Sequence, residues 1–288
     1  MLYYVQLAIN GLSQGLVVGL AALGITLVFG IARFANASAG DSLSFGAYMA
    51  LVGTRSAGSL LLGGVFAIVA GALAAVLSYK LVFKQLAGRS SVALLVGSIG
   101  LGFLIRGILG VVFGHQMAVF PMDMSPPYRI GPLIISSLDV RMAGVAALAL
   151  AVAFGTLYFT SIGRQMRAIA DNPDLARVSG ILPERVMVAL WCLVGGITAV
   201  AGMILGMKTV VSPEIGWEML LPAFAAAILG GVGSPVGAVL AGVLLGMAQE
   251  LSTPFVGFTY KIALSFVVIL LVLLIRPRGL LGRVEGVR

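Results

Sequence analysis

Seven long, predominantly apolar runs constrain this sequence more than any other feature. They cover residues 5–31, 58–79, 91–113, 140–160, 186–207, 235–252 and 258–276. A helix needs about 20 mostly apolar residues to cross a hydrocarbon layer of about 30 Å. Because 60% of the 288 residues are hydrophobic and only 10% are charged, a soluble globule could not bury its apolar surface. The sequence therefore predicts an all-α integral membrane protein with a single transmembrane domain over residues 1–288.

Two shorter apolar runs, residues 42–54 and 216–231, are too brief for a perpendicular crossing. Such segments cross a membrane by tilting or as broken helices. If both cross, the chain has about nine spans, with the amino terminus outside and the carboxyl terminus inside. The run at residues 5–31 is about twice the length of a signal-peptide core, so we interpret it as the first span.

The distribution of basic residues supports this orientation. Twelve of the 18 Lys and Arg residues fall inside: Arg33, Lys80, Lys84, Arg89, Arg164, Arg167, Arg177, Arg185, Arg276, Arg278, Arg283 and Arg288. Five fall outside, namely Arg55, Arg129, Arg141, Lys208 and Lys261, and Arg106 lies within a span. An excess of Lys and Arg marks the cytoplasmic side. The net charge of +8 thus indicates topology and not a nucleic-acid surface.

Two loops stand out between the spans. Residues 114–139 contain four prolines and few apolar repeats, which predicts a structured external loop. Residues 161–185 form the longest inner loop and contain a punctuated short helix: Asn172 can cap it, Pro173 suits its first position, and Gly180 can end it. A capped helix parallel to the membrane favours a docking element for a cytoplasmic partner, and the alternative is a solvated connector.

The sequence lacks the motifs of an enzyme. No Gly-x-x-x-x-Gly-Lys-Ser/Thr loop is present, because none of the four lysines follows a glycine. Neither a Ser/His/Asp arrangement nor His-Glu-x-x-His occurs, and Cys192, expected to be a small buried residue, has no partner for a disulfide. We therefore predict a transport protein without catalytic residues, cofactor or metal site.

Small-residue ladders within the spans predict close helix packing. They are Gly11/Gly15/Gly19, Gly110/Gly114, Gly202/Gly206 and Gly242/Gly246. Such ladders let helix backbones approach closely in lipid. We expect most of this packing to lie within one subunit, with a subunit interface as the alternative.

Three ionisable residues near the spans are candidates for function, since charges are costly in lipid. Arg106 lies well inside the run 91–113 and needs an internal partner or water, unless it bonds to helix-end carbonyls or snorkels outward. Glu250 lies near the outer end of its span, at the interface or lining a cavity. Asp41 can cap a helix beginning at Ser42.

Four stretches resemble the permease subunits of the branched-chain amino acid ABC importer family. Ala21-Ala-Leu-Gly-Ile-Thr-Leu-Val-Phe-Gly-Ile31 is similar to the opening helix of that family, and residues 163–181 resemble its coupling segment. Leu229-Gly-Gly-Val-Gly-Ser-Pro-Val-Gly-Ala238 resembles its glycine-rich connection, and Arg276-Pro-Arg-Gly-Leu-Leu-Gly282 its closing motif. The resemblance covers nearly the whole chain, and the coupling segment and glycine-rich stretch are its most specific parts.

This resemblance implies a multi-pass protein of the bacterial inner membrane with several partners. They are a second related permease in a heterodimer, two cytoplasmic ATPase subunits and a periplasmic solute-binding protein. The ATPases would dock on the inner loop, at positions carried over from the family: Gly163, Arg164, Arg167, Ala168, Ala176 and Gly180. The solute would pass between the two permeases.

One stretch departs from the family pattern. Members commonly show Asn-Phe-Ala-His-Gly-Glu after the first span, whereas this chain has Asn36-Ala-Ser-Ala-Gly-Asp41. The departure weakens any transfer of solute identity. The stretch opens a short span, and run 216–231 occupies a comparable place in the second half with opposite direction, which suggests an inverted repeat. Residues here and in the spans are candidates for the translocation pathway: Asn36, Gly40, Asp41, Arg106 and Glu250.

We therefore expect a permease subunit that moves a small solute, branched-chain or related amino acids, from periplasm to cytoplasm by alternating access. The alternative is an ion-coupled secondary transporter of small organic solutes, which would use a midplane carboxylate for its coupling ion. The sequence shows no acidic residue that is clearly central to the membrane, which counts against this alternative. A channel or scaffold would leave the capped inner helix unexplained.

Overall fold

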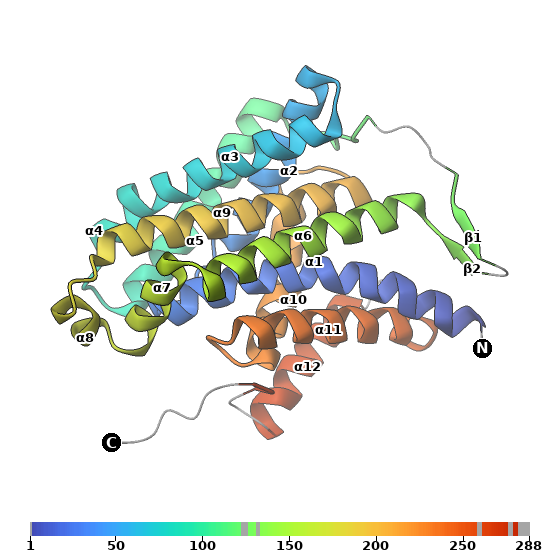
Figure 1. Cartoon of the computed structure of the whole chain (residues 1–288). Helices are drawn as coiled ribbons and strands as arrows, with labels where there is room; N and C mark the ends of the chain where they lie inside the picture. The colour runs from blue at the N-terminus through green and yellow to red at the C-terminus, as the bar shows by residue number, and fades with distance from the viewer. Residues whose placement is uncertain (1, 122–125, 131–132, 258–260, 276–278, 282–288) are drawn as a thin grey trace.

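The protein is a bundle of helices (Figure 1), and the computed structural model describes every residue except 1, 122–125, 131–132, 258–260, 276–278 and 282–288. The long helices are α1 (Leu2–Ala32), α2 (Ala39–Ala57), α3 (Leu60–Ser78), α5 (Ser91–Phe113), α6 (Ser137–Phe159), α9 (Pro183–Lys208), α10 (Ile215–Gly230), α11 (Pro235–Val256) and α12 (Lys261–Ile275). The short elements are the π-helix η1 (Tyr79–Phe83), α4 (Lys84–Leu86), β1 (Tyr128–Ile130), β2 (Leu133–Ile135), α7 (Ser161–Asp171) and α8 (Pro173–Val178).

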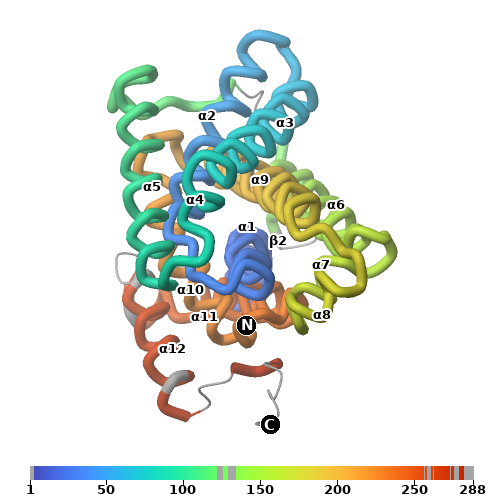
Figure 2. The backbone as a smooth tube through the Cα atoms, turned by 90° about the vertical axis from the view of Figure 1, so that its left-hand side faces the viewer, coloured from blue at the N-terminus to red at the C-terminus, as the bar shows by residue number. Residues whose placement is uncertain are grey.

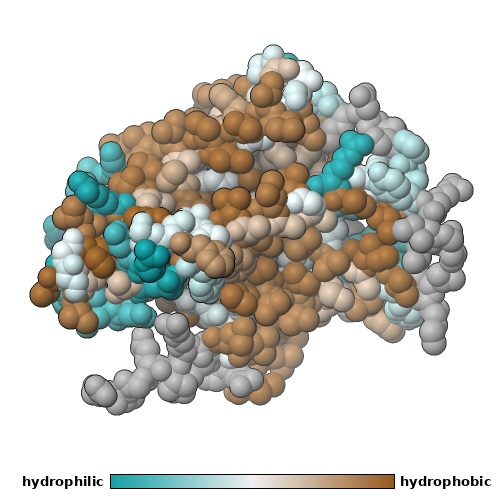
Figure 3. Space-filling view, in the orientation of Figure 1, coloured by the Kyte–Doolittle hydropathy of each residue, from teal (hydrophilic) through white to brown (hydrophobic). Residues whose placement is uncertain are grey.

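Each apolar run identified in the sequence forms one of the nine long helices, with ends that differ by only a few residues. The helical class predicted from composition is therefore confirmed. On length and composition alone, six helices of the described chain are suited to cross a membrane, and α10 and part of α12 are shorter apolar helices. Figure 3 shows the corresponding surface, with an apolar band between more polar ends.

Two antiparallel strands interrupt the all-α pattern. Within the predicted external loop, Tyr128 pairs with Ile135 and Ile130 with Leu133. An isolated bridge also joins Ala118 to Val211, and the loop ends earlier than predicted because α6 begins at Ser137. These strands were not predicted from the sequence, since each has only three residues.

The helices alternate between two ends of the molecule. At one end, which we call the hairpin end, Gln6 near the start of α1 donates to the Ile134 carbonyl of β2 at 2.8 Å. At the opposite end, which we call the α7–α8 end, Arg33 just after α1 donates to the Ala170 carbonyl of α7 at 3.1 Å. Figure 1 shows the β1–β2 hairpin and the α7–α8 pair at opposite sides of the bundle. The external and inner loops predicted from the sequence thus lie at different ends.

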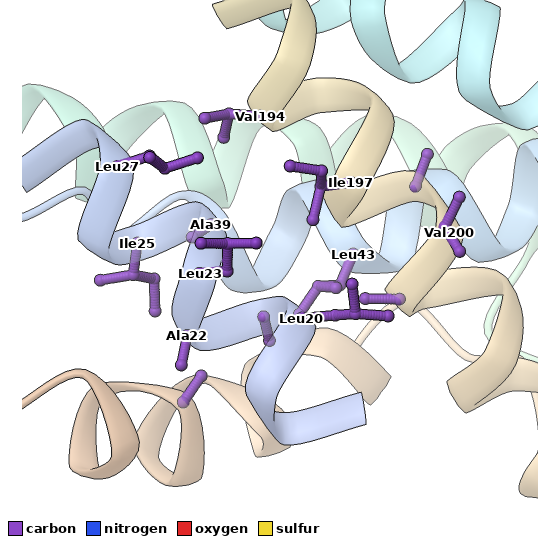
Figure 4. Close-up of a cluster of buried hydrophobic side chains, with 14 of the residues drawn as sticks. Leu20, Ala22, Leu23, Ile25, Leu27, Ala39, Leu43, Val194, Ile197 and Val200 are labelled. Atoms are coloured by element: carbon purple, nitrogen blue, oxygen red, sulfur yellow. The ribbon is translucent and has the colours of Figure 1, made fainter. Parts of the chain in front are cut away.

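The core is built where α1, α2 and α9 meet (Figure 4). Leu20 and Leu23 of α1, Leu43 of α2 and Ile197 of α9 are buried there and belong to one apolar cluster. The ladder Gly15 and Gly19 of α1 faces Gly246 and Gly242 of α11, with backbone so close that a Cβ atom would collide. For these two ladders, the close packing of helices within one subunit that was predicted from the sequence is therefore present.

The two halves of the chain repeat one packing scheme. Helix α1 packs along α11, and its counterpart α9 packs along α3. Helix α2 lies against α3, α5 and α9, as α10 lies against α11, α12 and α1. These exchanged contacts are what an inverted repeat predicts. In these contacts α2 and α10 occupy equivalent places in the two halves of the chain. The chain enters α2 from the α7–α8 end and α10 from the hairpin end.

The single cysteine is placed differently from the prediction. Cys192 is exposed on α9 and not buried. An apolar run in a membrane protein has apolar residues on its outer face as well as its inner face, so the run could not show which side Cys192 occupies.

Candidate functional site

Helices α2 and α10 begin beside each other between the two ends of the bundle. A Cβ atom on Gly40 would lie 2.6 Å from the carbonyl oxygen of Gly216, so only glycine allows this approach. Ser44 joins the same two helices: its hydroxyl donates to the Pro213 carbonyl at 2.9 Å and accepts from the Gly216 amide at 3.0 Å. We call this contact the helix crossing.

Non-helical backbone reaches the helix crossing from both ends. Residues 33–38 enter from the α7–α8 end, and residues 209–214 enter from the hairpin end. Asn36 is buried, and its Oδ1 accepts hydrogen bonds from the amide and hydroxyl of Ser38. The amide of Ala37 donates to the hydroxyl of Ser98 on α5. Side chains thus satisfy this buried irregular backbone, as membrane depth requires.

A buried ion pair joins the start of α2 to α5. Arg106 donates through Nε to Oδ1 of Asp41 at 2.9 Å, and its Nη2 lies 2.8 Å from the same oxygen. The Asp41 side chain is only 1% exposed and that of Arg106 is 17% exposed. Arg106 therefore has the internal partner that the sequence called for. Asp41 is not a helix cap, because α2 begins at Ala39 and places Asp41 in the first turn.

Two aromatic rings surround the guanidinium of Arg106. Its Cζ lies 4.6 Å from the ring centroid of Trp217 on α10 and 5.2 Å from that of Phe103 on α5. Neither ring was predicted as a partner of Arg106, since nothing in the sequence pattern links residues 103, 106 and 217. A cation between aromatic faces gains electrostatic stabilisation that increases where water is excluded.

The first two turns of α10 carry exposed residues on one face: Trp217, Glu218 and Leu221. Glu218 follows directly from the helix crossing, and Asp41 lies at it. Asp41, a candidate from the sequence, and Glu218, which was not one, thus both lie near the helix crossing.

Two further ion pairs fasten helices nearer the hairpin end. Glu250 of α11 lies 2.6 Å from Nζ of Lys261 on α12. Lys208 of α9 lies 2.9 Å from Asp139 of α6, and Ser13 of α1 bonds to both. Each of these side chains is largely buried. Glu250 therefore lies apart from the helix crossing, with a partner of its own.

The inner loop has the local structure that its punctuation predicted. Oδ1 of Asn172 accepts from the amides of Asp174 and Leu175, each at 3.0 Å, and Pro173 occupies the first turn of α8. Gly180 follows the helix with φ of 80°, in the left-handed region. The preceding residues form a second helix, α7, whose amino terminus is capped by Thr160.

The predicted docking residues divide into packed and exposed positions. Gly163 is buried where α7 turns back on α6, and Arg167 donates to the Leu157 carbonyl and lies over the Tyr158 ring. Ala168 is half-buried and Ala176 is only 4% exposed, so the Ala176 methyl faces the chain itself. Arg164 and Gly180 are exposed.

Two apolar side chains of α8 point outward instead. Leu175 is 64% exposed and Val178 is 87% exposed. The six-residue helix is too short for its periodicity to separate these residues from Ala176 in the sequence. They give α8 an apolar outer surface at the α7–α8 end.

The inner loop also contacts the irregular segment that leads to the helix crossing. Arg33, with φ of 60°, donates to the carboxyl-terminal part of α7. The next residue, Phe34, is buried, with its ring 5.1 Å from that of Phe83 and 6.5 Å from that of Trp191 on α9. A chain of contacts therefore runs from the inner loop through residues 33–38 to Asp41.

This architecture, in which α2 and α10 and the irregular segments before them meet between two polar ends, is typical of a membrane permease. The family model described as branched-chain amino acid transport system / permease component matches residues 7–275, and the chain belongs to this family of ABC importer permeases. The resemblance found in the sequence is confirmed. The chain is a transport subunit and a multi-pass protein of the inner membrane.

Curated relatives match the chain along nearly all of its length. The high-affinity branched-chain amino acid transport system permease protein LivH of Escherichia coli K12 is 28% identical, over 99% of this chain and 97% of the relative. BraD of Pseudomonas aeruginosa, with the same description, is 29% identical over 98% and 97%. The ribose import permease protein RbsC of Escherichia coli K12 is 28% identical over 92% and 84%.

One solved structure shares the fold. PsaBC from Streptococcus pneumoniae, in complex with Fab, superimposes with a TM-score of 0.50 and 16% sequence identity, covering 93% of this chain and 91% of that chain. At this identity the likeness concerns the fold alone.

Proposed function

We propose that the chain crosses the membrane nine times, with the hairpin end outside and the α7–α8 end inside. Two cytoplasmic ATPase subunits dock on residues 161–185, and a periplasmic binding protein delivers solute at the hairpin end, to the loop of residues 114–139. ATP-driven closure of the ATPases moves α7 and α8 and rocks the helices between two access states. The observation that carries this proposal is the capped α8 at one end, with Leu175 and Val178 exposed.

The basic residues support this orientation. Among the described residues, the α7–α8 end has Arg33, Lys80, Lys84, Arg89, Arg164, Arg167, Arg177 and Arg185, in or beside segments that join helices at that end. The hairpin end has fewer, namely Arg55, Arg129, Arg141, Lys208 and Lys261. An excess of this sign belongs on the cytoplasmic side.

The second permease packs against the face formed by α5 and α12, and the pathway lies between the two subunits. Figure 2 shows α5 and α12 along one side of the molecule, with α10 between them. Both helices expose large apolar side chains, among them Phe103 and Leu270. Asn36, Gly40, Asp41 and Arg106 support the pathway from the helix crossing, whereas Glu250 joins α11 to α12 at its edge.

The solute is an amino acid with an apolar side chain. The names of LivH and BraD support this solute class. The Arg106–Asp41 ion pair, together with the exposed Glu218 of α10, also supplies charges of both signs. The partner permease is a different, related chain, so the pair is a heterodimer.

Uptake into proteoliposomes tests the proposal. We expect the purified chain to remain bound to a second permease and an ATPase, and radiolabelled leucine to enter only with ATP and a binding protein. The same vesicles without ATP but with a proton or sodium gradient are the control. Uptake driven by such a gradient alone would reject the ATP-driven importer in favour of a secondary transporter.

Replacing Leu175 with aspartate should weaken docking of the ATPase. A charge in the apolar outer surface of α8 would be buried without a partner at the interface, at a cost of about 1–3 kcal/mol, which corresponds to roughly 5- to 150-fold in affinity. Co-purification of the ATPase with the permease measures this loss. The matched variant Ser179→Asp, at an exposed polar position beside the same helix, should retain the ATPase. Equal retention by both variants would remove Leu175 from the interface.

A further inference from the structure

Arg33 has a backbone conformation that suits glycine better than arginine. It follows the last residue of α1 with φ of 60°, in the left-handed region, and its amide donates to the Phe29 carbonyl at 3.0 Å. Among the described residues, no other residue except glycine has a positive φ. Helices commonly end with a residue in this conformation, and glycine is the usual choice because it adopts it without strain. The arginine keeps a strained backbone, and its side chain supplies a contact that glycine cannot make.

The side chain of Arg33 connects the end of α1 to the end of α7. Its Nη2 donates to the Ala170 carbonyl at 3.1 Å. Ala170 lies in the last turn of α7, where carbonyls have no partner within the helix and where the helix dipole favours a positive charge. The guanidinium provides both a donor and a positive charge. The bond therefore joins the inner loop to the first residue of the irregular segment 33–38.

The rest of this segment is held by buried contacts up to the start of α2. The Phe34 ring is buried and lies 5.1 Å from the ring of Phe83. The Asn36 side chain accepts from the amide and hydroxyl of Ser38, the residue directly before α2. Because close-packed side chains and hydrogen bonds transmit strain, a displacement of Arg33 reaches α2 and is not absorbed by loose chain.

The second irregular segment, residues 209–214, has a corresponding connection at the hairpin end. The Ala118 amide donates to the Val211 carbonyl at 2.9 Å, and the Val211 amide donates back to the Ala118 carbonyl at 2.8 Å. Ala118 belongs to the external loop of residues 114–139, and Val211 is fully buried. A movement of the external loop at Ala118 therefore displaces the backbone that leads into α10.

Ser44 joins the two segments at the helix crossing. Its hydroxyl donates to the carbonyl of Pro213, in the second segment, and accepts from the amide of Gly216, in α10. The Ser44 side chain is fully buried. The described contacts thus form one chain that runs from Ala170 of the inner loop, through the helix crossing, to Ala118 of the external loop.

We propose that Arg33 is a positioning residue that couples the inner loop to the helix crossing, and that the Ala118–Val211 bridge is its counterpart at the hairpin end. Docking of the loaded binding protein on the external loop shifts residues 209–214, the helix crossing passes the shift to residues 33–38, and Arg33 passes it to α7. We call this chain of contacts the coupling relay. It also acts in reverse, since the coupling of two binding events is reciprocal. This inference rests on the proposed function and assigns the residues that connect its two partners.

ATP hydrolysis and leucine uptake by the complete importer in proteoliposomes test the role of Arg33. Arg33→Gly removes the bond to α7 and suits the left-handed backbone, so the variant should unfold at about the wild-type temperature. We expect the stimulation of hydrolysis by a leucine-loaded binding protein, and ATP-dependent leucine uptake, each to fall about five-fold, as for the loss of one hydrogen bond. Hydrolysis without binding protein should be unchanged. Arg33→Lys, which keeps a donor for the Ala170 carbonyl, should restore most of the stimulation.

Arg89→Gly is the matched control. Arg89 is exposed in the turn between α4 and α5 at the same end, so this variant also loses one positive charge but leaves the bond from Arg33 to α7 in place. It should keep the full stimulation. Wild-type stimulation in Arg33→Gly would overturn the inference, as would an equal fall in Arg33→Gly and Arg89→Gly.

A second variant, Ala118→Pro, shows whether the two connections belong to one relay. Proline has no amide hydrogen to donate to the Val211 carbonyl, whereas the control Val119→Pro, at an exposed position, leaves both bonds of the bridge in place. We expect Ala118→Pro to lower the stimulation, and the double variant with Arg33→Gly to lose no more than either single variant, because both changes interrupt one path. Losses that multiply in the double variant would show independent effects and overturn the coupling relay.

The wild-type importer separates this inference from the proposed function. ATP-dependent leucine uptake by the wild type, with a defect in Arg33→Gly, supports both. ATP-dependent uptake that Arg33→Gly does not alter would overturn the coupling relay and leave the ATP-driven permease standing. Failure of ATP to drive uptake by the wild type would reject the proposed function, and the relay with it.

Discussion

Replacing Gly216 with alanine should strongly destabilise the protein. A Cβ atom there would overlap the Gly40 carbonyl oxygen and lie 2.9 Å from the amide nitrogen of Ser44. Both are backbone atoms of α2, so no side chain can rotate away. The separation needed to relieve the overlap would also break the hydrogen bond from the Gly216 amide to the Ser44 hydroxyl. We expect a cost of about 3 kcal/mol or more.

Thermal unfolding of the detergent-purified protein, followed by size-exclusion chromatography, measures this cost. Gly144→Ala on α6 is the matched control, because a Cβ atom on Gly144 would meet nothing within 4 Å. Alanine is the better helix former, so the control should be as stable as the wild type or slightly more so. A Gly216→Ala protein that unfolds at the wild-type temperature would mean that α2 and α10 do not cross as closely as described.

The sequence predicted the helices because length and apolarity decide where a chain can cross lipid. It also predicted both ends of α8, since the Asn172 side chain bonds to amides at its start and Gly180 adopts a left-handed dihedral angle after its end. Local signals of this kind need no knowledge of the rest of the fold. The family resemblance was confirmed for the same reason, because it depended on local motifs such as residues 229–238 and 163–181.

The contacts between distant segments were not predictable. Asp41 and Arg106 are 65 residues apart, and a single sequence shows each only as a charge that needs an explanation. The Asp41 cap was a reasonable local interpretation, but it depended on a helix start that was three residues off. The side of α8 to which Ala176 belongs was equally open, since fewer than two turns cannot define a face.

Replacing Asp41 with alanine should be strongly destabilising. The variant would leave the Arg106 guanidinium in a largely buried place without its counter-charge, and breaking a buried pair in this way costs about 3–5 kcal/mol. Glu184→Ala is the matched control, because the Lys84–Glu184 pair also joins two helical segments but is about half exposed on each side, at 49% and 59%. An exposed pair contributes little to stability, because water screens the two charges. Unfolding temperatures of the two variants give the comparison.

Removing both partners separates the role of the pair in folding from its role in transport. The double variant Asp41→Ala/Arg106→Met has no unpaired charge, so it should be more stable than Asp41→Ala alone. Its leucine uptake should nevertheless fall, because the ion pair that supports the proposed pathway is gone. A double variant no more stable than the single one would show that Arg106 does not depend on Asp41. The Asp41 carboxylate would then have to act in transport without fixing the position of the guanidinium.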